Sequence, residues 1–146
     1  MKFSEFHQGM VAETGPVVLT EQDILEFAQR YDPQWFHVDA TASADGPYGG
    51  LIASGFQTCC VGMRLAVDGF LADSESFGSP GLAYLKWLAP VRPNDSLSLR
   101  ITVLEHRRSS KNTDIGVLRW RWEILNQQRA SVLELEATSL FDLKRT

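Results

Sequence analysis

One apolar stripe constrains the fold of this chain more than any other feature of the sequence. From Phe56 onward, apolar side chains recur at the three- and four-residue intervals of one helix face: Phe56, Cys59, Cys60, Met63, Ala66, Val67 and Phe70. Arg64 is the only charged residue in this segment before Asp68. Ser54 and Gln57 have the spacing of a capping box, which predicts that the helix begins there. A helix this apolar is expected to be buried on most of its sides, so the rest of the chain must cover it.

The pattern changes after Gly81 from helical to strand-like. We expect a turn at 90–95, a charged loop at 105–114, and strands at 81–89, 97–103, 117–125 and 133–143. Within 117–125, Trp120, Trp122 and Ile124 fall on one face and charged residues fall on the other. Long consecutive strands with short links indicate an antiparallel sheet. The predicted fold class is therefore α+β, with a curved antiparallel sheet wrapped around one central apolar helix.

The N-terminal part of the chain is predicted to add a strand and a helix. Gly15-Pro16 separates two short apolar runs, 10–12 and 17–19, which could be a strand and its continuation. Residues 20–23 have the form of a capping box, and apolar residues at helical spacing follow it to about Arg30. Pro33 disfavours helical geometry at Asp32 and so ends the helix there. A further helical turn is expected at 40–44.

Length and charge narrow the classes of function. At 146 residues the chain is expected to form a single domain, 1–146. The net charge of −4 provides no basic footprint for nucleic acid. No apolar run approaches the ~18 residues that cross a bilayer, so no membrane contact is expected, and the N-terminus does not have the form of a signal peptide. Cys59 and Cys60 are adjacent and could not easily close a strain-free disulfide with each other, so a reducing, cytoplasmic setting is expected.

The residues with catalytic potential lie just before the apolar helix. Asp32 and His37 are five residues apart on a bend that contains Pro33, and Gly55 follows at the first turn of the predicted helix. Asp32 and His37 could hold one water between them and act as acid and base. The N–H of Gly55 is placed to stabilise an oxyanion, and the missing side chain lets a substrate approach closely. Taken alone, Asp32 could equally be a loop carboxylate and His37 a histidine packed among aromatics.

This segment resembles the motif of the MaoC-like dehydratases, the (R)-specific enoyl-CoA hydratase branch of the hot-dog fold. The family motif places a histidine five residues after an aspartate and then runs Gly-x-(Ile/Val)-(Ala/Val)-(His/Ser)-Gly, which corresponds to 32–37 and 50–55 here. The likeness extends through 87–95, so it covers nearly the whole chain. It implies a hydratase or dehydratase acting on the 2,3 bond of an acyl-CoA thioester, with Asp32 and His37 as the catalytic pair and Gly55 as the oxyanion donor. It also implies a homodimer or larger homo-oligomer, with coenzyme A arriving as part of the substrate and no separate cofactor.

The remaining site residues are expected to contact substrate. Ser54 and Gly50 belong to the glycine motif, Trp35 helps to fix the loop, and Arg92 could meet the phosphates of coenzyme A. Met63 falls near a position where several (R)-hydratases carry a supporting serine, and a thioether cannot hydrogen-bond as that serine would. Either the serine is dispensable here, or the substrate differs, or the activity is weakened.

Three alternatives remain at the level of sequence. A hot-dog thioesterase commonly places an acid on the central helix, but residues 55–67 contain none. A non-catalytic acyl-CoA-binding subunit is compatible with the apolar Met63. A metal site built on His37 and Asp39 lacks a second histidine in a matching strand pattern, so no metal is expected. The cysteines are interpreted as packing residues, and His7 and His106 as solvated.

Overall fold

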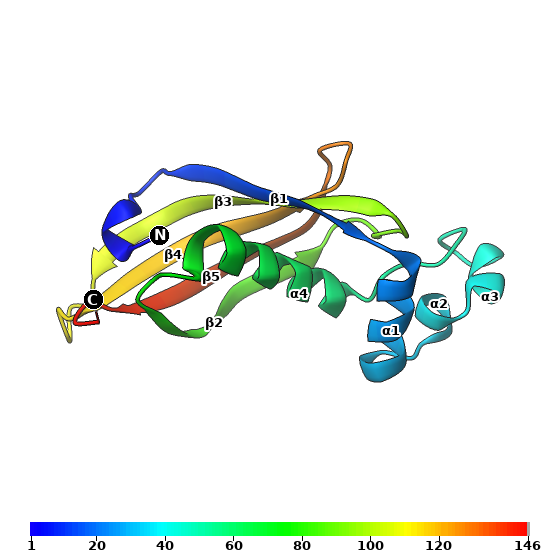
Figure 1. Cartoon of the computed structure of the whole chain (residues 1–146), viewed down its shortest axis with the longest axis horizontal. Coiled ribbons are helices and arrows are strands. Elements are labelled where there is room, and N and C mark those ends of the chain that lie inside the picture. The colour runs from blue at the N-terminus through cyan, green and yellow to red at the C-terminus, as the bar shows by residue number, and fades with distance from the viewer. Residues whose placement is uncertain (146) are drawn as a thin grey trace.

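A five-stranded antiparallel sheet forms one side of the molecule. The computed structural model describes residues 1–145. The strands lie in the order β1-β3-β4-β5-β2, and every neighbouring pair is antiparallel. Their bounds are Val11–Leu19 (β1), Ser76–Trp87 (β2), Asp95–Arg108 (β3), Ile115–Leu125 (β4) and Ser131–Asp142 (β5). The sheet curves along helix α4, Gly55–Ala66, which lies against its inner face (Figure 1). The predicted α+β class and antiparallel sheet are confirmed.

The inner face of the sheet carries the core. Leu97, Leu99 and Ile101 of β3 are fully buried, and Trp120 and Ile124 continue the same layer on β4. This is the expected consequence of strand geometry, in which alternate residues point to the same face. The indole of Trp120 lies edge-on to Trp122, and its N–H donates to Ser139 Oγ at 3.2 Å. The predicted inward face of both strands is therefore confirmed.

Helix α4 is buried on one side only, so the expectation that it is buried on most sides is wrong. Thr58, Gly62, Leu65 and Ala66 are buried, whereas Phe56 is 65% exposed and Met63 is 45% exposed. The helix packs very close to the sheet at Gly62, where a Cβ would lie 2.9 Å from Ile124 Cδ1. The apolar stripe is thus divided: Phe56, Cys60 and Met63 are exposed, whereas Ala66 and Phe70 are buried. Beyond Ala66 the chain continues as a π-helical turn, Val67–Leu71.

The two predicted capping boxes have different outcomes. At the start of α1, Glu21–Tyr31, Thr20 Oγ1 accepts from the Asp23 N–H and the Thr20 N–H donates to the Asp23 carboxylate, so this capping box is confirmed. Ser54 makes no capping hydrogen bond. Its hydroxyl donates to Asp32, and the Gln57 side chain donates to the Asp23 carbonyl. The second capping box is therefore wrong, because tertiary partners outcompete the local ones.

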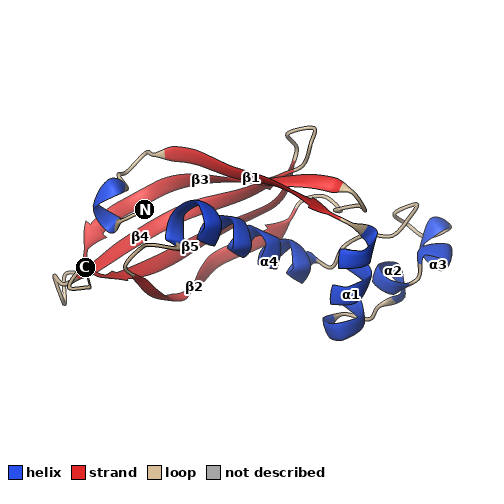
Figure 2. Ribbon diagram, viewed as in Figure 1, coloured by secondary structure: helices blue, strands red, loops and turns tan. Residues whose placement is uncertain are grey.

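Helices α1, α2 (Trp35–Val38) and α3 (Ala40–Ala44) gather at one end of the sheet, next to the first turn of α4 (Figure 2). The α3 turn has the predicted bounds, and Asp39 caps it by accepting from the Ala42 N–H. None of the helices described for residues 1–145 is both long and apolar enough to span a membrane.

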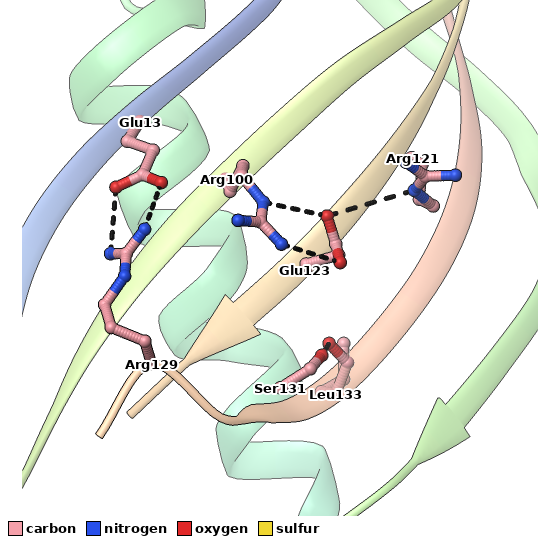
Figure 3. A network of polar contacts seen from close by, with 7 residues as sticks. All are labelled: Glu13, Arg100, Arg121, Glu123, Arg129, Ser131 and Leu133. Carbon is pink, nitrogen blue, oxygen red and sulfur yellow. Dashed lines mark hydrogen bonds and ion pairs between the residues drawn. The ribbon is translucent and has the colours of Figure 1, made fainter. Parts of the chain in front are cut away.

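The outer face of the sheet is lined by ion pairs that join its strands. Arg100 of β3 donates two hydrogen bonds to Glu123 of β4, and Arg129 pairs with Glu13 of β1 (Figure 3). Glu105 accepts from Arg119 across the same β3–β4 pair, so β3 continues to Arg108 where a loop from residue 105 was expected. That boundary was wrong because charged side chains on an outer face do not interrupt a strand.

His106 is also placed differently from the sequence interpretation. Its ring stacks on Phe3 with a centroid distance of 4.1 Å, and its Nε2 lies 3.0 Å from the Phe3 carbonyl oxygen. It therefore fixes the N-terminal turn, Phe3–Glu5, to β3 instead of being simply solvated. His7 is exposed, as expected, and both cysteines are free thiols.

Candidate active site

Asp32 and His37 meet where α1 gives way to α2. Asp32 follows the last residue of α1, and its own N–H still donates to the Ala28 carbonyl at 2.8 Å. Pro33 turns the chain, so that α2 begins at Trp35 and directs His37 back toward the aspartate. His37 Nε2 lies 3.3 Å from Asp32 Oδ2, with the imidazole 6% and the carboxylate 20% exposed. The pair predicted from a five-residue spacing is thus in direct contact.

Three side chains favour the ionised form of Asp32. Gln34 Nε2 donates to Oδ1 at 2.7 Å, and Ser54 Oγ donates to Oδ2 at 2.7 Å. The hydrogen bond from Gln34 is the largest cause that lowers the pKa of Asp32, burial acts in the opposite direction, and Ser54 and His37 lower the pKa further. Asp32 is therefore held as a carboxylate that can accept a proton.

A hydrogen bond at Nδ1 fixes the tautomer of His37. Its Nδ1 lies 2.7 Å from the Ile52 carbonyl oxygen. A carbonyl oxygen only accepts, so Nδ1 must carry the hydrogen in this contact. Nε2 is then the nitrogen that exchanges a proton with a substrate, a water or Asp32. The segment that supplies this carbonyl is itself buried and anchored, because the Ala53 N–H donates to the Val91 carbonyl at 2.8 Å.

His37 and Gly55 open onto the same cavity. A pocket of about 370 Å³ has walls that include Phe36, His37, Tyr48, Gly55, Thr58 and Trp87. Gly55 is the first residue of α4, so its N–H has no partner within the helix and lies at the positive end of the helix dipole. The indole of Trp87 packs so tightly on Gly55 that a Cβ there would lie 2.4 Å from its Nε1. Only glycine fits this position without displacing Trp87.

Three chemical capacities meet at this site: His37 and Gly55 line the cavity, and Asp32 contacts His37. Asp32 is a carboxylate that can take a proton, His37 can give or take one at Nε2, and Gly55 offers a backbone N–H to a negatively charged oxygen. Water activation next to a polarised carbonyl needs this combination. Among residues 1–145, no group of three or more His, Cys, Asp or Glu side chains is arranged to hold a metal ion.

The other predicted site residues lie in different places. Ser54 is fully buried behind Asp32, and Trp35 is half-exposed and packs against Gly46. Gly50 and Arg92 are neighbours, since a Cβ on Gly50 would lie 3.7 Å from Arg92 Nη1. Arg92 is exposed. Substrate contacts by these residues remain predictions.

Met63 lies in the wall of a second cavity, of about 530 Å³, together with Cys59 and Cys60. It is not among the residues that line the His37 pocket. Cys60 is exposed, so the interpretation of both cysteines as buried packing residues is wrong for Cys60. Its part of α4 belongs to the outer face.

Sequence reasoning missed three contributors to the site. Gln34 was not predicted as a site residue. Its place between Asp32 and His37 is the signal that could have identified it as a hydrogen-bond donor to either one. The Ile52 carbonyl carries no signal in the sequence. Trp87 was seen only as the first residue of a family-like stretch, because its contact with Gly55 depends on how β2 approaches α4.

Comparisons with known proteins identify the family and the fold. The family model described as a MaoC like domain matches residues 3–119. The uncharacterized protein YdeM of Bacillus subtilis (strain 168) is 33% identical over 141 residues, covering 96% of this chain and 98% of YdeM. Among solved structures, the MaoC-like dehydratase from Rhodospirillum rubrum has a TM-score of 0.88 at 29% identity, covering 95% of this chain and 94% of that chain. The unliganded R-hydratase PhaJ1 from Pseudomonas aeruginosa has a TM-score of 0.77 at 25% identity, with coverages of 95% and 84%.

Proposed function

This chain belongs to the MaoC-like domain family and has the hot-dog fold, and we propose that it is a hydratase or dehydratase of acyl-CoA thioesters. The reaction adds or removes water across the 2,3 double bond, and the hydroxyl product has the (R) configuration. The observation that carries the proposal is the 3.3 Å contact between Asp32 Oδ2 and His37 Nε2, with His37 in the wall of a pocket that Gly55 also lines. The likeness to a protein named as an R-hydratase supports the same reaction class.

Hydration follows from the positions of these groups. The Asp32 carboxylate takes a proton from water as the water oxygen bonds to C3 of the enoyl thioester. His37, carrying a proton on Nε2, gives it to C2, while the Gly55 N–H stabilises the negative charge on the thioester oxygen. The proton on Asp32 then passes to His37 across the 3.3 Å contact, which restores both groups. Dehydration is the same sequence in reverse.

Coenzyme A enters as part of the substrate, and no other cofactor takes part in these steps. Ser54 and Gln34 act on the reaction through Asp32, since both donate to its carboxylate. Arg92, exposed beside Gly50, is proposed to meet the phosphates of coenzyme A as the thioester enters. The free thiols of Cys59 and Cys60 are compatible with the reducing, cytoplasmic setting that we propose.

A homodimer is part of the proposal. β2 is an edge strand, and it carries exposed apolar side chains at Phe77, Leu82 and Trp87. The exposed stripe of α4, with Phe56 and Met63, adds further apolar surface. Exposed apolar surface of this extent beside a free strand edge is typical of an interface.

Turnover of trans-2-enoyl-CoA tests the function directly. Crotonyl-CoA and longer enoyl-CoAs are incubated with the protein, and loss of the conjugated thioester is followed by absorbance. We expect hydration without release of free thiol, and chiral chromatography of the product should give the (R)-3-hydroxyacyl thioester. Release of free coenzyme A would identify a thioesterase instead. Tight binding of acyl-CoA with no chemical change would identify a non-catalytic binding subunit.

A further inference from the structure

Trp87 lies beside the proposed active site, where it lines the His37 pocket. It is the last residue of β2 and is 48% exposed, yet its indole lies against the first turn of α4. A Cβ on Gly55 would lie 2.4 Å from its Nε1 and 2.5 Å from its Cε2. The ring of Phe56 holds it from the side, with a centroid distance of 5.5 Å. The indole is therefore fixed by contacts on two sides although half of it is open to solvent.

A second, larger cavity begins one helical turn further along α4. This cavity has a volume of about 530 Å³. The residues that line it include Cys59, Met63, Leu82, Leu85, Trp122 and Ala137. Its lining is almost entirely apolar, which suits an alkyl chain better than a nucleotide or a thioester head.

The two cavities are neighbours along the same pair of elements. Gly55, Cys59 and Met63 are four residues apart and so lie on one face of α4. Gly55 belongs to the His37 pocket, and Cys59 and Met63 belong to the larger cavity. On β2, Trp87 lines the first and Leu85 the second.

We propose that Trp87 determines the length of the acyl group that this protein accepts. Its indole closes the His37 pocket on the side of the larger cavity, so the wild-type protein takes short acyl groups of about four to six carbons. This inference rests on the proposed function, because the reacting carbons must lie between His37 and Gly55. The acyl tail beyond them then points along α4 toward the indole. Removal of the indole joins the two cavities and gives a longer tail an apolar space.

The test measures kcat/KM for trans-2-enoyl-CoAs of four to twelve carbons. Wild type should be most active on the short substrates and lose activity steeply beyond six carbons. Trp87→Ala should raise the ratio of dodecenoyl to crotonyl activity by at least about 10-fold, since each buried methylene of a substrate can contribute up to this factor. Trp87→Phe, with a smaller ring, should give an intermediate profile.

Two further variants show whether the larger cavity receives the tail. Ala137 of β5 lines that cavity and does not line the His37 pocket. Ala137→Leu should therefore fill the larger cavity alone. The double variant Trp87→Ala, Ala137→Leu should lose the gain on long substrates. Phe77→Ala is the matched control, because Phe77 is an exposed aromatic residue on the same strand that lines neither cavity. Circular dichroism and the melting temperature confirm that each variant is folded.

Binding separates this inference from the proposed function. Saturated acyl-CoAs of the same lengths cannot be hydrated, and calorimetry gives their Kd with each variant. If no enoyl-CoA is turned over, the hydratase proposal fails, while the dependence of Kd on chain length still tests Trp87. Parallel profiles of wild type and Trp87→Ala, in turnover and in binding, would overturn the role of Trp87. A wild type that accepts twelve carbons as well as four would overturn it too.

Discussion

At the scale of single residues, the candidate site depends on how Asp32 and His37 are held. Each makes a second, rigid contact away from the other: Asp32 with Gln34 and Ser54, and His37 with the Ile52 carbonyl. These contacts fix the orientation of both groups, so that the Asp32 carboxylate lies against His37 Nε2. Loss of either group should therefore affect chemistry far more than folding.

Asp32→Asn and His37→Ala should each lower kcat on crotonyl-CoA by about 10²–10⁴-fold, the usual contribution of one acid or base group. Both side chains belong to the loop region between α1 and α4, outside the core of the sheet. The melting temperature should change little in Asp32→Asn, whereas His37→Ala also removes the hydrogen bond to the buried Ile52 carbonyl and should lower the melting temperature. Asp39→Asn and His7→Ala are matched controls, because Asp39 caps α3, a role that asparagine keeps, and His7 is exposed. Near-wild-type turnover by both site variants would remove Asp32 and His37 from the mechanism.

The hydrogen bond from Gln34 predicts a pH effect with a definite sign. It is the largest cause that lowers the pKa of Asp32, so Gln34→Ala should raise that pKa toward its ordinary value. Because the base must be ionised, the acid limb of the kcat/KM profile should move to higher pH. Gln22→Ala is the control, since Gln22 is an exposed glutamine that bonds only Glu26. An unmoved acid limb in Gln34→Ala would show that Asp32 is not the base.

The same pKa shift links Asp32 to stability. Its pKa in the folded protein is below its value in the unfolded chain, so its contribution is present above the unfolded pKa. That contribution is lost as the pH falls through the folded pKa. The difference in melting temperature between wild type and Asp32→Asn should therefore be constant near neutral pH and change only in the acid range.

At the scale of elements, α4 shows which properties the sequence can predict. Its position and length follow from the apolar periodicity, and its direct packing against the sheet was expected. Which of its faces meets the sheet could not be predicted from the stripe, because Gly62 lies there through close approach and not through hydrophobicity. Phe56 and Met63, which dominate the pattern, face outward.

The close approach at Gly62 can be measured by adding the same side chain at two positions of α4. Gly62→Val places a Cβ 2.9 Å from Ile124 Cδ1 and should lower the free energy of unfolding by roughly 1–3 kcal/mol through overpacking. Arg64→Val introduces the same β-branched residue at an exposed position of the helix, where no close neighbour opposes it. Chemical denaturation compares the two. Equal losses of stability would mean that Gly62 is not needed for packing.

The site shows the same division between what sequence can and cannot predict. Asp32, His37 and Gly55 were identified from spacing and resemblance, because their chemistry needs particular residue types in a particular order. Trp87 and the Ile52 carbonyl could not be identified in this way, since one acts through shape and the other through the main chain. The prediction of Ser54 as a helix cap was wrong. Its hydroxyl donates to Asp32, 22 residues away, and makes no hydrogen bond with the backbone of α4.

At the scale of the whole molecule, the two edges of the sheet differ. Both edge strands contain a proline and an irregular register, with Pro16 in β1 and Pro80 in β2, so the edges differ in their surroundings and not in their regularity. β2 carries the exposed apolar residues beside α4. We therefore expect the homodimer to form through β2.

Sedimentation equilibrium tests this assembly. Wild type should have twice the 16.4 kDa mass of the chain, and Leu82→Glu on β2 should shift the population to single chains, because the charge would be buried at the interface. Val11→Glu is the control: Val11 is an exposed valine on β1, the opposite edge. Dissociation by Val11→Glu, with an intact dimer in Leu82→Glu, would assign the interface to β1.

The ion pairs on the outer face of the sheet also have a consequence for how the strands find their alignment. A slip of one residue between β3 and β4 would turn the core side chains outward, so burial alone rejects it. A slip of two residues keeps every apolar side chain on the inner face of the sheet, so burial alone does not reject it. Arg100 faces Glu123 and Thr102 faces Arg121, so such a slip can bring Arg100 opposite Arg121. Like charges in that position are unfavourable. The outer face thus excludes a misfolded sheet that the hydrophobic core would accept.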